Sequence, residues 1–151
     1  MDRESLLKLW DQWWDGDVWI APWARALEGV SAEQAAWQPT GRDGAPRHSI
    51  WQNVAHILLW RNVTFDILEG RGRPDDAELK ARNFAAPAEA TEAAWAASRQ
   101  ALADSHRRMR ALIADPSVPL DRPRFHVTHD AYHLGQIMYI RAMLGLPPAD
   151  A

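Results

Sequence analysis

The sequence contains no cysteine. Disulfide bonds, thiolate zinc sites, iron–sulfur clusters and a cysteine nucleophile are therefore excluded. A bound metal ion would need histidine or carboxylate ligands, and thiol chemistry would need a thiol from outside the chain. These absences narrow the possible metal sites to nitrogen and oxygen donors.

Long apolar runs and a large net charge are missing as well. No apolar run approaches the roughly 18 residues that a membrane span requires. The charged N-terminus MDRESLLKLW lacks the small-residue cleavage site of a signal peptide. The formal net charge of −3 gives no cationic surface for nucleic acid. We therefore expect a cytoplasmic protein with neither a membrane nor a nucleic-acid partner.

Strand signals are almost absent, and helical periodicity dominates the chain. The length of 151 residues predicts a single domain, 1–151. Ser31 with Gln34, and Ser49 with Gln52, have the spacing of capping boxes, which mark helix starts. Four long helical segments are predicted, at about 3–27 (divided near Gly16 and Pro22), 50–69, 89–114 and 121–145.

The expected fold class is all-α, in the form of a four-helix bundle. Short loops tend to join antiparallel neighbours, but about 15–18 residues separate the second and third helices. This long connection permits a crossover and favours an up-down-down-up order. The nine tryptophans are expected mostly in the core, with Trp10, Trp13 and Trp14 filling either the bundle or a dimer interface.

The fourth predicted helix carries a histidine pair, His129 and His133. Four residues apart on a helix, two imidazoles lie on one face and can hold one metal ion, although such pairs also occur on solvated faces. Gly135 beside them would allow close helix approach. The stripe that contains the pair spans an arc of about 100° and is otherwise largely apolar, which predicts that it faces the bundle; it comprises His126, His129, His133, Gln136, Ile137, Ile140 and Leu144.

A third ligand is expected from the second predicted helix. His56 lies away from the polar flank of that helix, so it would face the inward pair. Three imidazoles and one open position are the arrangement of a catalytic zinc site, although three imidazoles also suit nickel, copper or iron. The chain has no HExxH motif and no paired ExxH motifs, which excludes a zincin protease and a di-iron carboxylate bundle.

Five further residues have weaker assignments. Trp60, one turn after His56, is expected to wall the metal cavity. His48 precedes a helix and is expected in a loop at the mouth of the pocket. His126 either lines the pocket or supports a ligand, and Gln136 is the candidate for orienting a bound ligand. His106 lies in the basic run DSHRRMR, which predicts a solvated face.

The strings ALEGVSAEQAAWQP, HSIWQNVAHILLW and HDAYHLGQIMYIRAMLG resemble, in this order, the DinB-like (YfiT-type) family of metal-dependent enzymes. The resemblance covers nearly the whole chain. It implies a four-helix bundle with a long crossover, usually dimeric, that binds zinc or nickel through three histidines. Matched by motif, these are His56, His129 and His133. Family members include thiol-dependent S-transferases and a thiol-dependent isomerase. The loop over residues 116–120 is short here, so the substrate is not carried over.

Two functions remain open from the sequence. The first is a metal-dependent enzyme: a transferase in which a low-molecular-weight thiol attacks an electrophilic small molecule, or a metal-hydroxide hydrolase. The alternative is a non-catalytic bundle, braced by metal, that serves as a binding or dimerisation module, because no general base is evident near the ligands. A structural ion is closed by four protein ligands, whereas a catalytic ion keeps one position open.

Overall fold

The computed structural model describes residues 1–16, 19 and 21–149. Across these residues the chain forms helices and no β-strand, apart from a single bridge between Thr40 and Pro46. The helices are α1 (Arg3–Asp15), α2 (Trp23–Ala26), α3 (Ala32–Ala36), α4 (Ile50–Leu68), α5 (Asp76–Arg82), α6 (Glu92–Ala114) and α7 (Asp121–Met143). The predicted all-α class is confirmed, and the up-down-down-up order stays a prediction. None of the described helices is both long and apolar enough to cross a membrane.

Local signals set most of the helix boundaries. Both predicted capping boxes are confirmed: Ser31 and Ser49 accept from the backbone three residues on, and the glutamine side chains accept in return. Gly16 ends α1, and the chain turns helical again after Pro22. The last predicted helix ends at Met143, and Gly145 adopts a left-handed conformation (φ 68°) that terminates it.

The start of the third long helix and the connection before it differ from the prediction. The third long helix begins at Glu92 rather than near residue 89, because the Thr91 side chain accepts from Ala94 N and caps it there. The connection before it is not all loop, since it contains the short helix α5, capped by Asp75. Seven residues with one buried side chain, Leu79, are too few to show a helical period. Helix α7 begins at Asp121, where the fourth helix was predicted to start.

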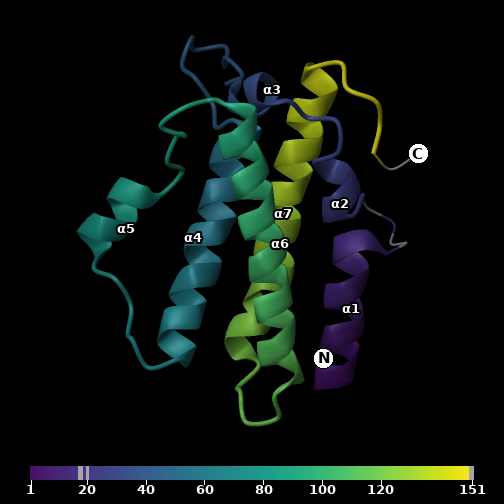
Figure 1. Cartoon of the computed structure of the whole chain (residues 1–151), viewed down its shortest axis with the longest axis vertical. Helices are drawn as coiled ribbons and strands as arrows, with labels where there is room; N and C mark the ends of the chain where they lie inside the picture. The colour runs from purple at the N-terminus through teal and green to yellow at the C-terminus, as the bar shows by residue number, and fades with distance from the viewer. Residues whose placement is uncertain (17–18, 20, 150–151) are drawn as a thin grey trace.

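The four long helices α1, α4, α6 and α7 lie lengthwise side by side (Figure 1). Helix α4 packs against both α6 and α7, and α6 also packs against α1. The connection between α4 and α6 swings out to one side and carries α5 (Figure 1). Helix α4 therefore stands between α6 and α7 on one side and the α5 connection on the other, which places its residues at the centre of the fold.

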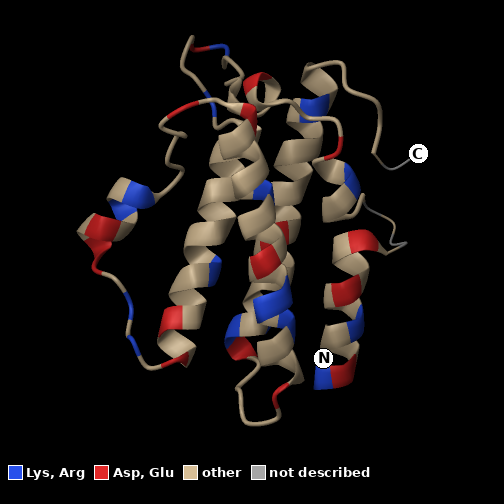
Figure 2. Cartoon of the chain, viewed as in Figure 1, with Lys and Arg blue, Asp and Glu red and all other residues tan. Residues whose placement is uncertain are grey.

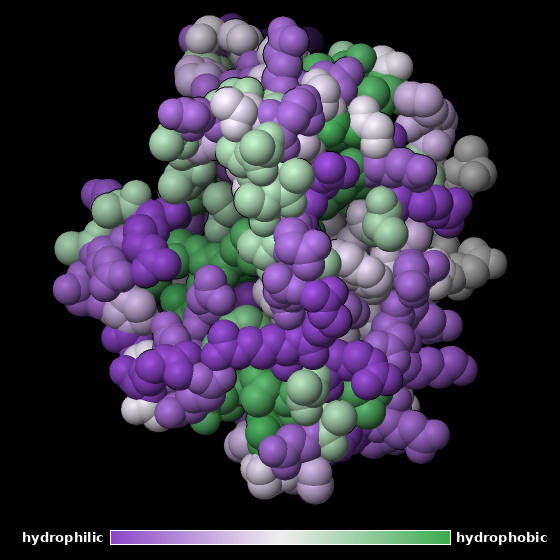
Figure 3. Space-filling view, viewed as in Figure 1, coloured by the Kyte–Doolittle hydropathy of each residue, from purple (hydrophilic) through white to green (hydrophobic). Residues whose placement is uncertain are grey.

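Tryptophans form much of the core. Trp23, Trp51 and Trp95 are buried in the largest cluster, formed mainly by α2, α3, α4, α6 and α7, while Trp10 is buried in a second cluster of α1, α4 and α6. A third cluster joins α5 to α4 through Leu79, and hydrophobic surface is visible between α5 and the long helices (Figure 3). Packing is therefore confirmed as the main role of the buried tryptophans.

Charged side chains of both signs are interspersed on the outer helices. Lysine, arginine, aspartate and glutamate occur along α1, along α5 and in the lower half of α6, and the upper half of α4 has none (Figure 2). Arg61 differs from these surface charges, because it is a buried charge in the middle of α4. A buried guanidinium needs a buried anion, and its partner lies next to the histidine cluster.

Candidate metal centre

Three histidines from two helices converge between α4 and α7. His56 comes from α4, and His129 and His133 come from consecutive turns of α7. One ring nitrogen of each lies within 4.8 Å of the others. The Nε2 atoms of His56 and His129 are 3.1 Å apart. Two imidazole ligands of one tetrahedral ion would be about 3.3 Å apart at ordinary bond lengths. The cluster can therefore hold a divalent metal ion.

The second nitrogen of each ring is occupied by a side-chain oxygen. His56 Nδ1 lies 2.6 Å from Asn83 Oδ1, and His129 Nδ1 lies 3.0 Å from Asp130 Oδ1. His133 Nδ1 lies 3.0 Å and 2.7 Å from the amide oxygens of Asn53 and Gln136, respectively. Amide and carboxylate oxygens only accept hydrogen bonds, so each Nδ1 carries the proton and donates it. The three Nε2 lone pairs are left free, which is the tautomer that metal ligands need.

This tautomer explains why the cluster fits a cation. With both Nδ1 atoms protonated, the Nε2 atoms of His56 and His129 approach to 3.1 Å as two lone pairs. No hydrogen bond joins two lone pairs, so a proton or a metal ion must lie between them to stabilise the contact. Burial lowers the pKa of His56 to about 4, although the hydrogen bond that His56 donates to Asn83 opposes this shift, and the neighbouring imidazoles lower the pKa further. Burial likewise lowers the pKa of His133. At neutral pH a metal ion is therefore the better match.

Asp130, which accepts from His129, is also part of a buried ion pair with Arg61. Asp130 Oδ2 accepts from Arg61 Nε at 3.0 Å and from Nη2 at 2.7 Å, and both side chains are 1% exposed. Arg61 Nη1 also donates to Ser105 Oγ of α6 at 2.8 Å. Burial alone would raise the pKa of Asp130, but the Arg61 guanidinium and the imidazoles of His126 and His129 together lower it well below its usual range. Asp130 is therefore a carboxylate that accepts from His129.

A cavity of about 720 Å³ opens onto the histidines. All three cluster histidines line it, and so do Trp60 and His126. His126 is buried, with Nε2 2.8 Å from Thr64 Oγ1, while its Nδ1 has no hydrogen-bond partner among the described residues. Trp60 and His126 thus border the same cavity as the three cluster histidines. The inward stripe of α7 is confirmed: its seven residues are buried or half-buried.

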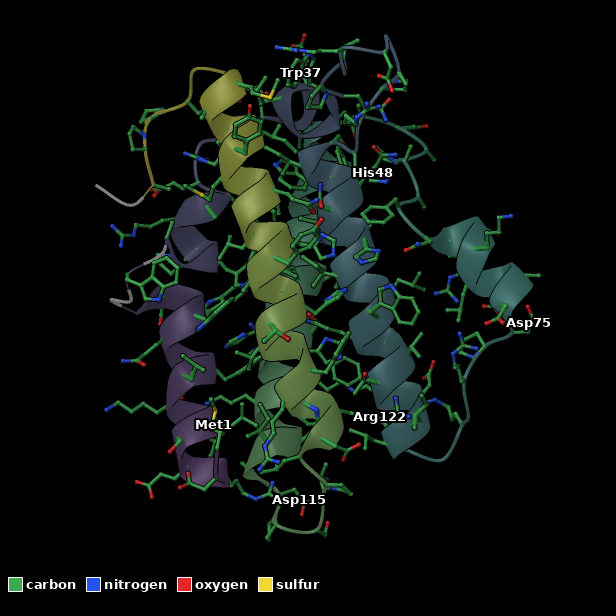
Figure 4. The ribbon with its side chains drawn as sticks, turned by 180° about the vertical axis from the view of Figure 1, so that it is seen from behind. Met1, Trp37, His48, Asp75, Asp115 and Arg122 are labelled. Atoms are coloured by element: carbon green, nitrogen blue, oxygen red, sulfur yellow. The ribbon has the colours of Figure 1, made fainter. Side chains whose placement is uncertain are left out.

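His48 and Gly135 do not line the cavity over the three histidines. Both line a second cavity of about 610 Å³, which also contains Gln136. His48 is exposed and stacks on Phe84 at 3.7 Å, and Phe84 stacks in turn on His56 at 4.0 Å. A Cβ atom on Gly135 would meet nothing within 4 Å, so the prediction that this glycine permits close helix approach was wrong. Figure 4 shows His48 at the upper end of α4 in that view.

The solvated face predicted for His106 was also wrong. Its ring is 5% exposed and stacks on Trp10, with ring centroids 5.0 Å apart and planes 7° from parallel. The basic run is a feature of sequence neighbours, whereas a helix sorts residues by angle. His106 shares the buried stripe of α6 with Met109, while Arg107 and Arg108 point outward.

Sequence reasoning missed Asn83, Phe84 and Arg61. Asn83 and Phe84 lie just after α5 in a connection without periodicity, and Phe84 is held by its carbonyl, which accepts from Gln52 Nε2 at 3.0 Å. Phe84 has a positive φ of 53°, a strained conformation in a residue that covers His56. For Arg61 a signal existed, because no other aspartate, glutamate, lysine or arginine lies between Ile50 and Phe65, and an arginine among apolar residues needs a buried anion.

Comparison with known proteins bears on the same residues. A family model described as the DinB superfamily matches residues 21–137, a range that includes all three cluster histidines and Asp130. Comparison with curated proteins gave no match, and neither did comparison with solved structures. The matched range covers well over half of the chain. The chain belongs to the DinB superfamily.

Proposed function

We propose that His56, His129 and His133 bind one divalent ion, zinc or nickel, and that the protein is a metal-dependent enzyme. The observation that carries the proposal is the set of oxygen acceptors on all three Nδ1 atoms, because it leaves the three Nε2 atoms free as ligands in a cluster whose ligand atoms lie within 4.8 Å of one another. When bound, the ion would lower the pKa of a coordinating thiol or water and polarise a substrate. The proposed reaction is thiol-dependent S-transfer to an electrophilic small molecule.

The chain's own residues would hold the ligands and shape the reaction space. Asn83 and Asp130 fix the rings of His56 and His129, and Arg61 keeps Asp130 ionised and in place. Gln136 accepts from His133 Nδ1, and we propose it as the residue that orients a bound ligand. Trp60 and Val63 present apolar surface to the cavity, where an apolar substrate would displace water.

The number of ligand groups favours catalysis over a structural brace. Among the described residues, the group formed by His56, His129 and His133 contains three side chains of ligating type, and it faces a cavity of about 720 Å³. His126 and Asp130 form a second such group with His129, but Asp130 already accepts from His129 Nδ1 and from Arg61. A structural zinc site is closed by four protein ligands, whereas a catalytic site leaves a position for water or substrate. A hydrolase that uses water in place of the thiol fits the same residues, so it is the second reaction to test.

Three finer expectations accompany this proposal. We propose a bundle in the up-down-down-up order, a homodimer as the family resemblance implies, and a cytoplasmic location. The dimer is tested by the molecular mass in solution. None of these expectations affects the ligand assignment, because all three histidines belong to one chain.

Metal content measured by elemental mass spectrometry tests the proposal. The protein would be purified without a histidine tag and compared with His56→Ala and with His48→Ala, a matched control outside the cluster. We expect near-stoichiometric zinc or nickel in the wild type and the control and none in His56→Ala. The loaded protein would then be assayed with several thiols and electrophiles. Absence of metal after reconstitution would refute the site, and a fourth protein ligand in X-ray absorption spectra would favour the structural alternative.

A further inference from the structure

The cavity over the histidines is lined by buried side chains at its base and by exposed side chains at its rim. At the base lie the buried side chains His56, His133 and Val63. The exposed lining residues form the rim, and they comprise Arg73, Asp121, Arg122, Phe125 and Tyr132. A ligand that reaches the histidines would therefore pass apolar and aromatic walls and leave one end beside charged groups.

Cations exceed anions at this rim. Arg73 is paired with Asp76, at 2.7 Å, but Asp76 is 88% exposed, so the pair is weak. Asp121 lies in the first turn of α7, where its carboxylate already stabilises the positive end of the helix. The Arg122 side chain takes part in no ion pair or side-chain hydrogen bond between described residues. It is therefore the rim charge that is available to a ligand.

Arg122 is also aligned with the histidines. It precedes His129 by seven residues on α7, so the two side chains lie on nearly the same face, about 10 Å apart along the helix axis. His126 lies between them and lines the same cavity. Figure 4 shows Arg122 near the start of α7, on the side that faces α4. A ligand that extends from the histidines along α7 would thus place its far end beside the guanidinium.

We infer that the cavity takes a ligand with an aromatic or other apolar body and one anionic group, a carboxylate or a similar oxyanion, which Arg122 binds. This inference rests on the proposed function for the reacting end of the ligand, but the Arg122 subsite itself needs no metal. The anion belongs either to the thiol or to the electrophile. Arginine suits this role because its planar fork of donors matches a carboxylate.

Matched acid and amide ligands test the subsite by isothermal titration calorimetry. The first pair, 4-(mercaptomethyl)benzoate and its benzamide, places the acid on the thiol. The second pair, 4-(chloromethyl)benzoate and its benzamide, places the acid on the electrophile and is assayed by its consumption with 2-mercaptoethanol on the zinc-loaded protein. A third pair without a reactive group, 4-ethylbenzoate and its amide, is titrated into metal-free protein. Arg122→Gln is compared with Arg124→Gln, a nearby arginine of α7 outside the cavity lining.

We expect the wild type and Arg124→Gln to prefer the acid about tenfold in the metal-free titration and in at least one of the other two arms, with Arg122→Gln losing the preference. The arm that shows it assigns the acid to the thiol or to the electrophile. Equal affinity for acid and amide in the wild type, a preference retained by Arg122→Gln, or no binding in any arm would overturn the inference. Zinc binding without acid preference would contradict this inference alone, whereas acid preference without zinc binding would contradict only the proposed function.

Discussion

Asn83 offers the cleanest test of how the metal centre is supported. Its side chain accepts from His56 Nδ1 at 2.6 Å, and its own backbone N–H caps α5 by donating to Leu79 O at 2.9 Å. The substitution Asn83→Ala removes the first interaction and keeps the second. His56 then loses the acceptor that holds the proton on Nδ1, so its ring can rotate or change tautomer.

The expected effect is a loss of zinc affinity of about 10- to 100-fold, the range for partners of metal-binding histidines. This corresponds to roughly 1.4–2.7 kcal/mol of binding free energy. The unfolding free energy of the metal-free protein should change by less than about 0.5 kcal/mol, because residue 83 lies on the surface. The variant therefore separates the effect on zinc affinity from the effect on folding stability.

A competition titration against a chromophoric zinc chelator measures the affinity, and urea unfolding measures the stability. Asn62→Ala is the matched control, since Asn62 is an exposed residue of α4 outside the cavity lining. Wild-type zinc affinity in Asn83→Ala would refute the reasoning that the Nδ1 acceptor prepares His56 for a metal. An equal loss in Asn62→Ala would show that the effect is not specific to this contact.

Two further predictions concern buried titratable groups. Asp130→Asn leaves the Arg61 guanidinium buried without an anion, so urea unfolding should show that the free energy of unfolding falls by about 3–5 kcal/mol. The double variant Arg61→Met, Asp130→Leu should recover most of this loss, and an Asp130→Asn protein as stable as wild type would contradict the pairing. Burial lowers the pKa of His106 from its ordinary 6.5 to about 4. As the pH falls, the imidazole is therefore protonated in the unfolded chain before it is protonated in the folded one. The stability that neutral His106 contributes above pH 6.5 is thus lost between pH 6.5 and 4. His106→Phe, which retains an aromatic ring against Trp10, should lose about 1–3 kcal/mol less than wild type over that interval, and identical slopes of stability against pH would refute the assignment.

The part of the site that could be predicted consists of residues whose helical period is visible in the sequence. His129 and His133 lie one turn apart within an otherwise apolar stripe, and His56 lies away from the polar flank of its helix. The period indicates which way such residues face, because a helix repeats every 3.6 residues. For the same reason the prediction of a solvated face from the basic run around His106 was wrong, since adjacent residues on a helix point in different directions.

The sequence by itself therefore determined the four long helices, two capping boxes and the inward direction of the three histidines, because those properties depend on neighbours within a few turns. Only the tertiary structure decided what those histidines contact. Asn83 reaches His56 across 27 residues and Arg61 reaches Asp130 across 69, and no local period relates such distant positions. The cavity and its arginine rim likewise exist only where α4 and α7 meet, since each helix contributes one wall.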